Sequence, residues 1–305
     1  MTKIGTSELD VYGLNLGCNV FNFTADEQAS HTVLDAYTAA GGNFLDTADL
    51  YGGGGGSERF IGTWLAKRGR RDDLVIATKV GMWDDRPGLS AKNIAAAAED
   101  SLQRLQTDHI DLYYAHRDDP GTPLEETLTA FDTLVRAGKV RYIAASNYEP
   151  ARLAEALSIS DREGLARYVA LQPQYNLVER DYEKELGPLV QREGLSTLPY
   201  FALALGFLTG KYRSKDEPGD SPRAPRALKY LDDRGERVLA TLDEVAAAHK
   251  TSVAAVSLAW LRSQPTIAAP IASARNTDQL KDLIASVSLE LSTGEIAALS
   301  EASAS

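Results

Sequence analysis

Eight short runs rich in aliphatic and β-branched residues alternate with longer amphipathic runs along this chain of 305 residues, and no other feature restricts the fold as much. The runs expected to be strands are 14–17, 43–46, 75–79, 110–115, 140–144, 169–172, 195–199 and 267–271. The runs with helical spacing of apolar residues include 26–40, 91–106, 123–137, 150–158 and 181–193. Strands that alternate with helices form a parallel sheet joined by right-handed crossovers. Eight such units predict a closed (β/α)8 TIM barrel, an α/β fold.

The turn after the first expected strand argues against the main alternative, an open doubly wound sheet that binds a dinucleotide. That fold places Gly-x-Gly-x-x-Gly at this turn, whereas residues 17–22 are Gly-Cys-Asn-Val-Phe-Asn. Residues 3–11 are interpreted as a β-hairpin that precedes the first barrel strand and covers the N-terminal end of the barrel. No linker or internal repeat marks a second unit, so we expect a single domain over 1–305.

An insertion with extra helices is expected between the seventh and eighth strands, over 201–264. It contains a polar loop rich in proline and arginine over 211–225, followed by two helices over 236–249 and 253–262. The insertion therefore enlarges the last strand–helix unit without adding a domain.

Charge and cysteine content exclude several classes of function. The chain has 32 Lys and Arg against 43 Asp and Glu, a net charge of −11, which repels nucleic acid and anionic lipid. Cys18 is the only cysteine, so no internal disulfide or thiolate metal site can form. The longest uncharged stretch, 194–210, is too short to span a membrane, and the first residues lack the apolar region of a signal peptide. We expect a cytoplasmic protein without a nucleic-acid or membrane partner.

Polar residues occur where successive expected strands end. They are Asp46, Lys79, His116, Ser146, Asn147, Gln172 and Tyr200, spaced by roughly the 30 residues of one strand–helix unit. Each one alone has an ordinary structural explanation, such as capping a turn or bonding loop backbone. Because the strand ends of a barrel converge on one mouth, an acid, a lysine and a histidine there, with Tyr51 nearby, indicate a functional site.

Three other kinds of site fit less well. The four histidines lack paired ligand spacing, so no metal site is expected. The glycine run 52–56 resembles a phosphate-binding loop, but Ser57 and Glu58 follow it where Gly-Lys-Ser/Thr is required, and we interpret it as a mobile loop beside Tyr51. Glycoside hydrolysis by Asp46 with Asp118 or Glu179 stays open, although nothing singles out a pair.

A tyrosine beside a lysine suggests a proton donor for a carbonyl oxygen. A free phenol has a pKa of about 10, and an ammonium ~4 Å away at an effective dielectric of ~20 favours the phenolate by about 4 kcal/mol. This predicts a Tyr51 pKa lowered towards 7, with Asp46 holding Lys79 in place and offsetting part of the shift. His116 would orient the substrate oxygen or share the proton. None of these groups supplies a hydride, so a reduction requires a nicotinamide cofactor.

Motifs distributed over nearly the whole chain resemble those of the aldo-keto reductase superfamily, in particular its bacterial branch that is also similar to potassium-channel β subunits. The matching segments are 42–51 (GNFLDTADLY), 77–81 (ATKVG), 102–105 (LQRL), 111–116, 138–143 (GKVRYI), 146–148 (SNY), 171–176 (LQPQYN), 206–211 (GFLTGK), 274–276 (ARN) and 279–280.

The resemblance implies NADPH-dependent, reversible reduction of aldehydes or ketones to alcohols. It makes Asp46, Tyr51, Lys79 and His116 the catalytic tetrad, with Tyr51 as the general acid. The cofactor contacts that it implies are Asp46, Ser146, Asn147, Gln172, Tyr200, Phe201, Leu203, Lys211, Arg275, Gln279 and Asp282. Ser146, Asn147 and Gln172 would hold the nicotinamide carboxamide and Tyr200 would stack on the ring. The Arg275 guanidinium suits the 2′-phosphate of NADP. The alternative that the resemblance allows is a nicotinamide-sensing binding protein with little turnover.

Four positions depart from the pattern of the superfamily. Phe201 follows Tyr200 where a serine that can bind the pyrophosphate is common, Ser273 replaces a glycine, Leu283 replaces an asparagine, and Asn22 replaces a glycine. A bulky Phe201 would pack on the cofactor or narrow the pocket.

The substrate is expected to be a small carbonyl compound. Its pocket is expected to include Phe21, Trp83 and Tyr148, which suit an apolar or aromatic compound. The sequence specifies neither the individual substrate nor the oligomeric state.

Overall fold

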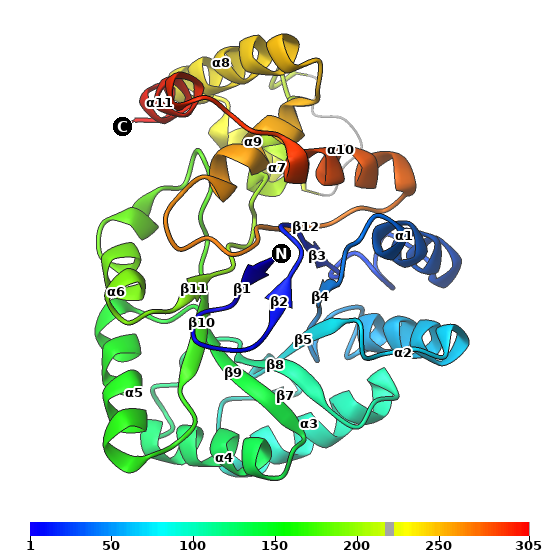
Figure 1. Ribbon diagram of the computed structural model, residues 1–305, viewed down its shortest axis with the longest axis vertical. Coiled ribbons are helices and arrows are strands. Elements are labelled where there is room, and N and C mark those ends of the chain that lie inside the picture. Colours follow the sequence, from blue (N-terminus) through cyan, green and yellow to red (C-terminus); the bar gives the residue numbers. More distant parts are fainter. Residues whose placement is uncertain (217–222, 305) are drawn as a thin grey trace.

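The computed structural model describes residues 1–216 and 223–304, and within them eight parallel strands form one sheet that curls into a barrel (Figure 1). The strands in chain order are β3 (Asn15–Gly17), β4 (Phe44–Asp46), β5 (Val75–Val80), β8 (Ile110–Ala115), β9 (Val140–Ser146), β10 (Tyr168–Gln172), β11 (Ser196–Thr197) and β12 (Ile271–Ala272). From β3 to β11 each strand pairs with the next in parallel, and β12 pairs with β3. The remaining gap is closed because the Thr197 N–H donates to Thr266 O and the Ala268 N–H donates to Thr197 O. The fold is therefore a (β/α)8 barrel.

The last strand is the one whose position differs most from the prediction. Residues 267–271 were expected to form it, but the strand covers Ile271–Ala272, and Ile267 makes only an isolated bridge to Thr197. Pro270 has no N–H to donate, so a regular ladder cannot run through it, although its carbonyl accepts from the Asn15 N–H.

Helices cover the outside of the barrel, each between consecutive strands. They are α1 (Glu27–Ala39), α2 (Gly56–Arg68), α3 (Ala91–Leu105), α4 (Leu124–Arg136), α5 (Pro150–Glu163), α6 (Leu186–Arg192) and, after β12, α10 (Thr277–Ser288). The predicted helix over 181–193 is split into a 3₁₀ turn, η1 (Asp181–Glu183), and α6. Helix α2 was not predicted. The glycine run that was interpreted as a loop leads directly into it, with Gly55 as the N-cap and Gly56 as the first helical residue.

The segment between β11 and β12 carries further helices. They are η2 (Ala204–Thr209), α7 (Ala224–Ala227), η3 (Leu228–Tyr230), α8 (Asp233–His249) and α9 (Val253–Arg262). Helix α8 packs against α9 and against the C-terminal helix α11 (Thr293–Ala302), and Figure 1 shows α8 and α11 at one edge of the barrel. Of the polar loop predicted over 211–225, residues 217–222 lie outside the described residues.

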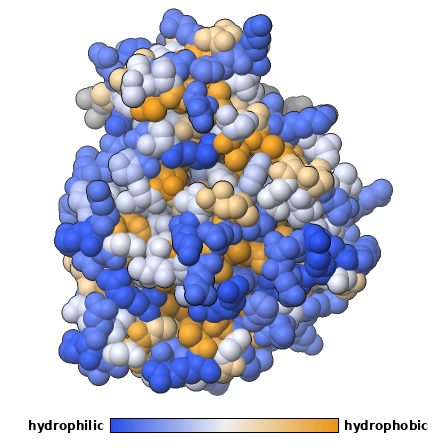
Figure 2. Space-filling view, in the orientation of Figure 1, coloured by the Kyte–Doolittle hydropathy of each residue, from blue (hydrophilic) through white to orange (hydrophobic). Residues whose placement is uncertain are grey.

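The N-terminal end of the barrel is covered by the start of the chain. Strand β1 (Thr2–Lys3) pairs antiparallel with β2 (Asp10–Val11), and Figure 1 looks onto this end. The Gly5 N–H donates to Ser196 Oγ at 2.7 Å and the Tyr12 N–H to Asn43 Oδ1 at 2.8 Å, which attaches the pair to the first residues of the strands. Figure 2 shows that the same face is largely hydrophilic on its outer surface.

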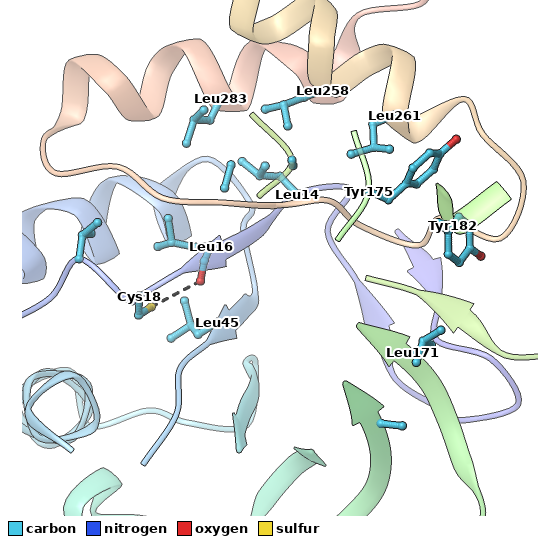
Figure 3. Packing of buried hydrophobic residues seen from close by; sticks show 14 of the residues in the cluster. Leu14, Leu16, Cys18, Leu45, Leu171, Tyr175, Tyr182, Leu258, Leu261 and Leu283 are labelled. Carbon is cyan, nitrogen blue, oxygen red and sulfur yellow. Dashed lines mark hydrogen bonds between the residues drawn. The ribbon is translucent and has the colours of Figure 1, made fainter. Parts of the chain in front are cut away.

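Side chains alternate between two apolar clusters, one inside the barrel and one between the strands and the helices. On β4, Phe44 points inward and Leu45 outward. Figure 3 shows part of the outer cluster, in which Leu14, Leu16 and Leu45 lie below Leu258 and Leu283. Because side chains on a strand alternate, the residues two positions beyond an inward apolar side chain also point into the barrel. No described helix is long and apolar enough to cross a membrane.

Candidate active site

A cavity of about 880 Å³ opens at the C-terminal end of the barrel, where polar side chains replace the apolar ones of its interior. Its lining includes Asp46, Tyr51, His116, Ser146, Asn147, Gln172, Tyr200, Phe201, Leu203, Lys211, Arg275, Gln279 and Asp282. The strand-end residues predicted from the sequence therefore meet at one site, and the volume falls in the range typical of small-molecule and cofactor pockets.

Asp46 and Lys79 form a buried ion pair at the floor of this cavity. Both follow the inward alternation, Asp46 two residues after Phe44 and Lys79 two residues after Ala77. The Lys79 Nζ donates to Asp46 Oδ1 at 2.5 Å and to the Thr47 carbonyl at 2.7 Å. Burial opposes the charge of Lys79, but its interactions with Asp46 and Tyr51 outweigh that effect and raise the pKa of the ammonium. Lys79 therefore stays positively charged.

The polar side chains beside the ion pair are held in place by hydrogen bonds to neighbouring residues of the site. The Gln172 Nε2 donates to Asp46 Oδ2 at 2.8 Å, and Ser146 Oγ donates to the Gln172 carbonyl at 2.9 Å. The Asn147 Nδ2 donates to the His116 carbonyl at 2.8 Å, and the Tyr200 hydroxyl donates to Asn147 Oδ1 at 2.8 Å. This network leaves little freedom to the polar wall beside the ion pair.

The pKa of Tyr51 is higher than predicted from its distance to a lysine. The Lys79 Nζ lies 5.0 Å from the centroid of the Tyr51 ring, close enough to act on its hydroxyl. Burial nevertheless raises the pKa of the phenol more than Lys79 lowers it, and the Asp46 charge adds to the rise. The prediction of a pKa near 7 is wrong because it weighed the ammonium without the loss of solvation. Tyr51 is a protonated phenol at neutral pH.

His116 is a neutral imidazole beside Tyr51. The two rings are in edge-to-face contact, with centroids 5.9 Å apart and an interplanar angle of 82°. His116 is buried, and burial followed by the charges of Lys79 and Arg117 holds its pKa well below the usual range. Its Nδ1 is buried and has no hydrogen-bond partner among the described residues. It can therefore take part in a hydrogen bond to a bound molecule without carrying charge.

The cavity wall away from the tetrad is rich in cations. Lys211 and Arg275 were expected there, and Gln279 Oε1 accepts from the Arg275 N–H at 3.0 Å. The lining also contains Arg223 and Arg226, which were not predicted from the sequence. The charges of Arg226 and Arg275 help to lower the pKa of Arg223, after burial, so the guanidinium groups act on one another. The signal for Arg223 was the arginine content of the polar loop predicted over 211–225, and Arg226 directly follows that loop.

The positions that depart from the superfamily pattern lie at or beside this cavity. The Phe201 backbone is left-handed, with φ 49°, and the Arg226 guanidinium lies 5.7 Å from its ring centroid. Ser273 Oγ donates to Asn19 Oδ1 at 2.7 Å. A Cβ added to Gly17 would lie 2.7 Å from the same Ser273 Oγ. Leu283 also lines the cavity. Phe201, Ser273 and Leu283 therefore all line the cavity.

Asn22 anchors the glycine run next to Tyr51. Its Nδ2 donates to the Gly52 carbonyl at 2.8 Å. Gly52–Gly55 all have positive φ, from 68° to 83°, a conformation that other residues rarely adopt. A Cβ on Gly55 would lie 2.3 Å from Arg104 Nε, so this backbone passes directly over the half-buried Arg104 side chain.

The aromatic residues expected in the substrate pocket do not line the cavity. Phe21 lies in the apolar core, and Tyr148 is buried with its hydroxyl hydrogen-bonded to that of Tyr168 at 3.2 Å. Trp83, on the β6–β7 hairpin (Met82–Trp83 and Arg86–Pro87), lies against Gly54. The residues that line the cavity from these loops are Val20, Phe23, Thr24, Leu50, Met82 and Arg117.

The carboxylates that could have paired with Asp46 in a hydrolase do not line the cavity. Asp118 accepts two hydrogen bonds from Arg152, at 2.9 and 3.0 Å. Glu179 Oε1 accepts from the Tyr230 hydroxyl at 2.7 Å and from Lys229 Nζ at 3.0 Å. The geometry therefore gives no support to two-carboxylate hydrolysis.

Comparison with known proteins identifies the family of this chain. The model of the aldo/keto reductase family matches residues 11–304. The chain is 34% identical to protein tas of Escherichia coli, over 97% of this chain and 95% of that protein. It is 35% identical to the uncharacterized oxidoreductase YrpG of Bacillus subtilis (95% and 91%) and 34% identical to a probable voltage-gated potassium channel subunit beta of Oryza sativa (91% and 88%). The chain belongs to the aldo/keto reductase family of oxidoreductases, as its motifs predicted.

Proposed function

We propose that this protein, acting as a single domain, reduces aldehydes or ketones to alcohols with NADPH and also catalyses the reverse oxidation. The observation that carries the proposal is the position of Tyr51, a protonated phenol between the Asp46–Lys79 ion pair and the neutral His116 at the floor of the cavity. Carbonyl reduction in general is supported by the family.

Each residue of the tetrad has a separate role in the transfer of the proton. Tyr51 donates its proton from Oη to the carbonyl oxygen of the substrate, and the Lys79 ammonium stabilises the phenolate that remains. Asp46 holds Lys79 charged and in place. His116 positions the carbonyl oxygen by a hydrogen bond. Because burial raises the Tyr51 pKa, the phenol is in its acid form at neutral pH, which suits the reduction.

The lining of the cavity fits a dinucleotide cofactor. Ser146, Asn147 and Gln172 present polar groups beside the tetrad, and the Tyr200 ring lies next to them. When bound, the nicotinamide supplies the hydride that is added to the carbonyl carbon. Beyond this end, Lys211 and Arg275, joined by Arg223 and Arg226, would bind the phosphates of an anionic cofactor to a protein whose net charge is −11.

Replacing Tyr51 by phenylalanine tests the proposal. We expect Tyr51→Phe to bind NADPH with nearly unchanged Kd, because only the hydroxyl is lost, and to lose turnover of aldehydes by a factor of about 10² to 10⁴. NADPH consumption against a panel of aldehydes and ketones, with cofactor binding followed by fluorescence titration, measures both. Equal turnover by Tyr51→Phe and the unaltered protein would refute the role of Tyr51.

The preference for NADPH is tested at Arg275. Arg275→Met is expected to weaken NADPH binding by about tenfold or more, as the loss of a charge-assisted contact to a phosphate does, and to change NADH binding much less. The Kd values of both cofactors give the result. A similar loss for NADPH and NADH would contradict a contact to the 2′-phosphate.

A nicotinamide-sensing binding protein is the second candidate, because one relative is a probable channel subunit. It predicts NADPH binding without appreciable consumption in the presence of any carbonyl compound, so the same panel separates the two functions.

A further inference from the structure

Arg117 is a cation in the cavity lining to which the proposed function assigns no role. It follows His116 directly, on the loop after β8, and lines the same cavity. Its charge lowers the pKa of His116, so the guanidinium acts at the tetrad end of the site. Among residues 1–216 and 223–304, no carboxylate forms an ion pair or a hydrogen bond with Arg117.

The acidic residues that follow Arg117 in the sequence do not neutralise it. Both oxygens of Asp118 accept from Arg152. Asp119 Oδ2 accepts from the Leu89 N–H at 2.8 Å and from Thr122 Oγ1 at 2.7 Å. The loop is built so that its two carboxylates bond to other parts of the chain while the guanidinium faces the cavity.

The other charges of the cavity leave Arg117 unbalanced. The remaining cations of its lining are Lys211, Arg223, Arg226 and Arg275, which the proposed function assigns to the phosphates of the cofactor. The acidic lining residues are Asp46, which is paired with Lys79, and Asp282. An unpaired guanidinium in a protein of net charge −11 is available to bind an anion.

Apolar side chains also line the cavity that contains Arg117. Val20, Met82 and Phe23 line the cavity, and Phe23 is a large apolar side chain that is 67% exposed. Exposed apolar side chains around a cavity commonly mark ligand-binding surfaces. The cavity therefore offers apolar side chains together with a guanidinium whose charge acts on His116.

We propose that the carbonyl substrate carries a carboxylate, which Arg117 binds while Tyr51 and His116 hold the carbonyl oxygen. The inference rests on the proposed function and specifies its substrate class. A planar guanidinium binds a carboxylate through two parallel hydrogen bonds, so it would also fix the orientation of the substrate. Such charge-assisted bonds are expected to raise kcat/KM for the acid by about tenfold to a hundredfold.

Matched substrates test the substrate class. The kcat/KM values of 3- and 4-carboxybenzaldehyde are compared with those of 3- and 4-methylbenzaldehyde in the unaltered protein, Arg117→Met and Arg117→Lys. The difference in intrinsic reactivity between the aldehydes cancels when the acid-to-methyl ratio is compared between variants. We expect Arg117→Met to lower this ratio by about tenfold to a hundredfold and Arg117→Lys to retain part of it.

Arg237→Met serves as the control variant, because Arg237 is an exposed arginine of α8 outside the cavity. It removes the same charge from the protein and should leave the ratio unchanged. A binding measurement that needs no turnover accompanies the kinetics. In the presence of NADP+, calorimetric titration with 4-methylbenzoate, which cannot be reduced, should give a Kd at least tenfold weaker for Arg117→Met than for Arg237→Met.

The possible failures are distinguishable. If the methylbenzaldehydes are turned over and Arg117→Met has the same ratio and the same 4-methylbenzoate affinity as the unaltered protein, the substrate class is wrong and the proposed function stands. If no aldehyde of either kind consumes NADPH, the proposed function fails and the substrate class fails with it.

Discussion

Two buried groups of charged residues lie on opposite sides of the segment that carries Tyr51, and they differ in how their charges are matched. The inner group, inside the barrel, contains one acid and one base. Lys79 Nζ donates to Asp46 Oδ1, and the other oxygen of Asp46 accepts from Gln172. Every oxygen of this buried carboxylate therefore has a partner.

The outer group, between the strands and α3, contains two acids. Glu58 accepts from Arg104 Nε and from Thr78 Oγ1, both at 2.6 Å. Asp49 is fully buried, and neither of its carboxylate oxygens has a hydrogen-bond partner among the described residues. Burial, and then the charge of Glu58, raise the pKa of Asp49 to about 7, although Arg104 and Arg86 act in the opposite direction.

The comparison teaches that burial alone does not determine the charge of a carboxylate in this protein. Asp46 has its own cation at hydrogen-bond distance, whereas Asp49 shares distant cations with a second acid. In the inner group the pKa of the Lys79 ammonium is raised, so Lys79 stays charged at neutral pH. In the outer group the carboxyl of Asp49, with a pKa of about 7, changes its charge near neutrality.

Removing the cation of the inner group should have the largest effect. Lys79→Met leaves the Asp46 carboxylate buried without its ion pair, which is expected to lower the free energy of unfolding by about 3–5 kcal/mol and to abolish measurable turnover. Urea unfolding and NADPH consumption provide the measurements. The double variant Asp46→Asn/Lys79→Met should recover stability but not turnover, and a double variant as unstable as Lys79→Met would contradict the matched pair.

Removing the charge of Asp49 should have the opposite sign. A carboxyl whose pKa is about 7 when folded and near 3.8 when unfolded makes the folded state less stable as the pH rises between these values, and the loss persists above them. Asp49→Asn should therefore stabilise the protein at pH 8, by up to about 4 kcal/mol, and hardly at pH 4. Urea unfolding at pH 4, 6 and 8 measures the effect; destabilisation at pH 8 would show that the ionised Asp49 is needed for the fold.

Changing the neighbour of Asp49 should have the smallest effect on the pH dependence of stability. Glu58→Gln removes a negative charge that raises the Asp49 pKa, so the pH dependence of stability is expected to move to lower pH. The same change removes the charged partner of Arg104, and the loss of this ion pair lowers the overall free energy of unfolding. The midpoint of the pH dependence of Tm separates the two effects, and an unchanged midpoint would exclude coupling between the two acids.

The barrel and the composition of the site were predictable because both depend on position along the chain. Polar residues such as Asp46, Lys79 and His116 follow strands at regular intervals, and parallel strands bring their ends together. Helix α2 was missed because the glycines before it gave a loop signal that covered its first residue.

The features of the site that could not be predicted from the sequence depend on which side chains are buried. Phe21 and Tyr148 are aromatic residues near strand ends, and only packing shows that they belong to the core. The Tyr51 pKa was predicted with the wrong direction for the same reason, since a charge can be inferred from spacing but solvation cannot. Arg223 and Arg226 reach the cavity from an insertion whose path the sequence does not give.

The pairing of β1 with β2 has a consequence for the far end of the barrel. Ile4, Leu9 and Val11 belong to the same interior cluster as Tyr114, and the Lys79 Nζ lies 5.6 Å from the centroid of the Tyr114 ring. One continuous column of side chains thus connects the start of the chain to the ammonium beneath Tyr51. Because Ile4, Leu9 and Val11 are buried at the end of this column, we expect removal of the first eleven residues to expose the barrel interior to water from the end opposite the cavity.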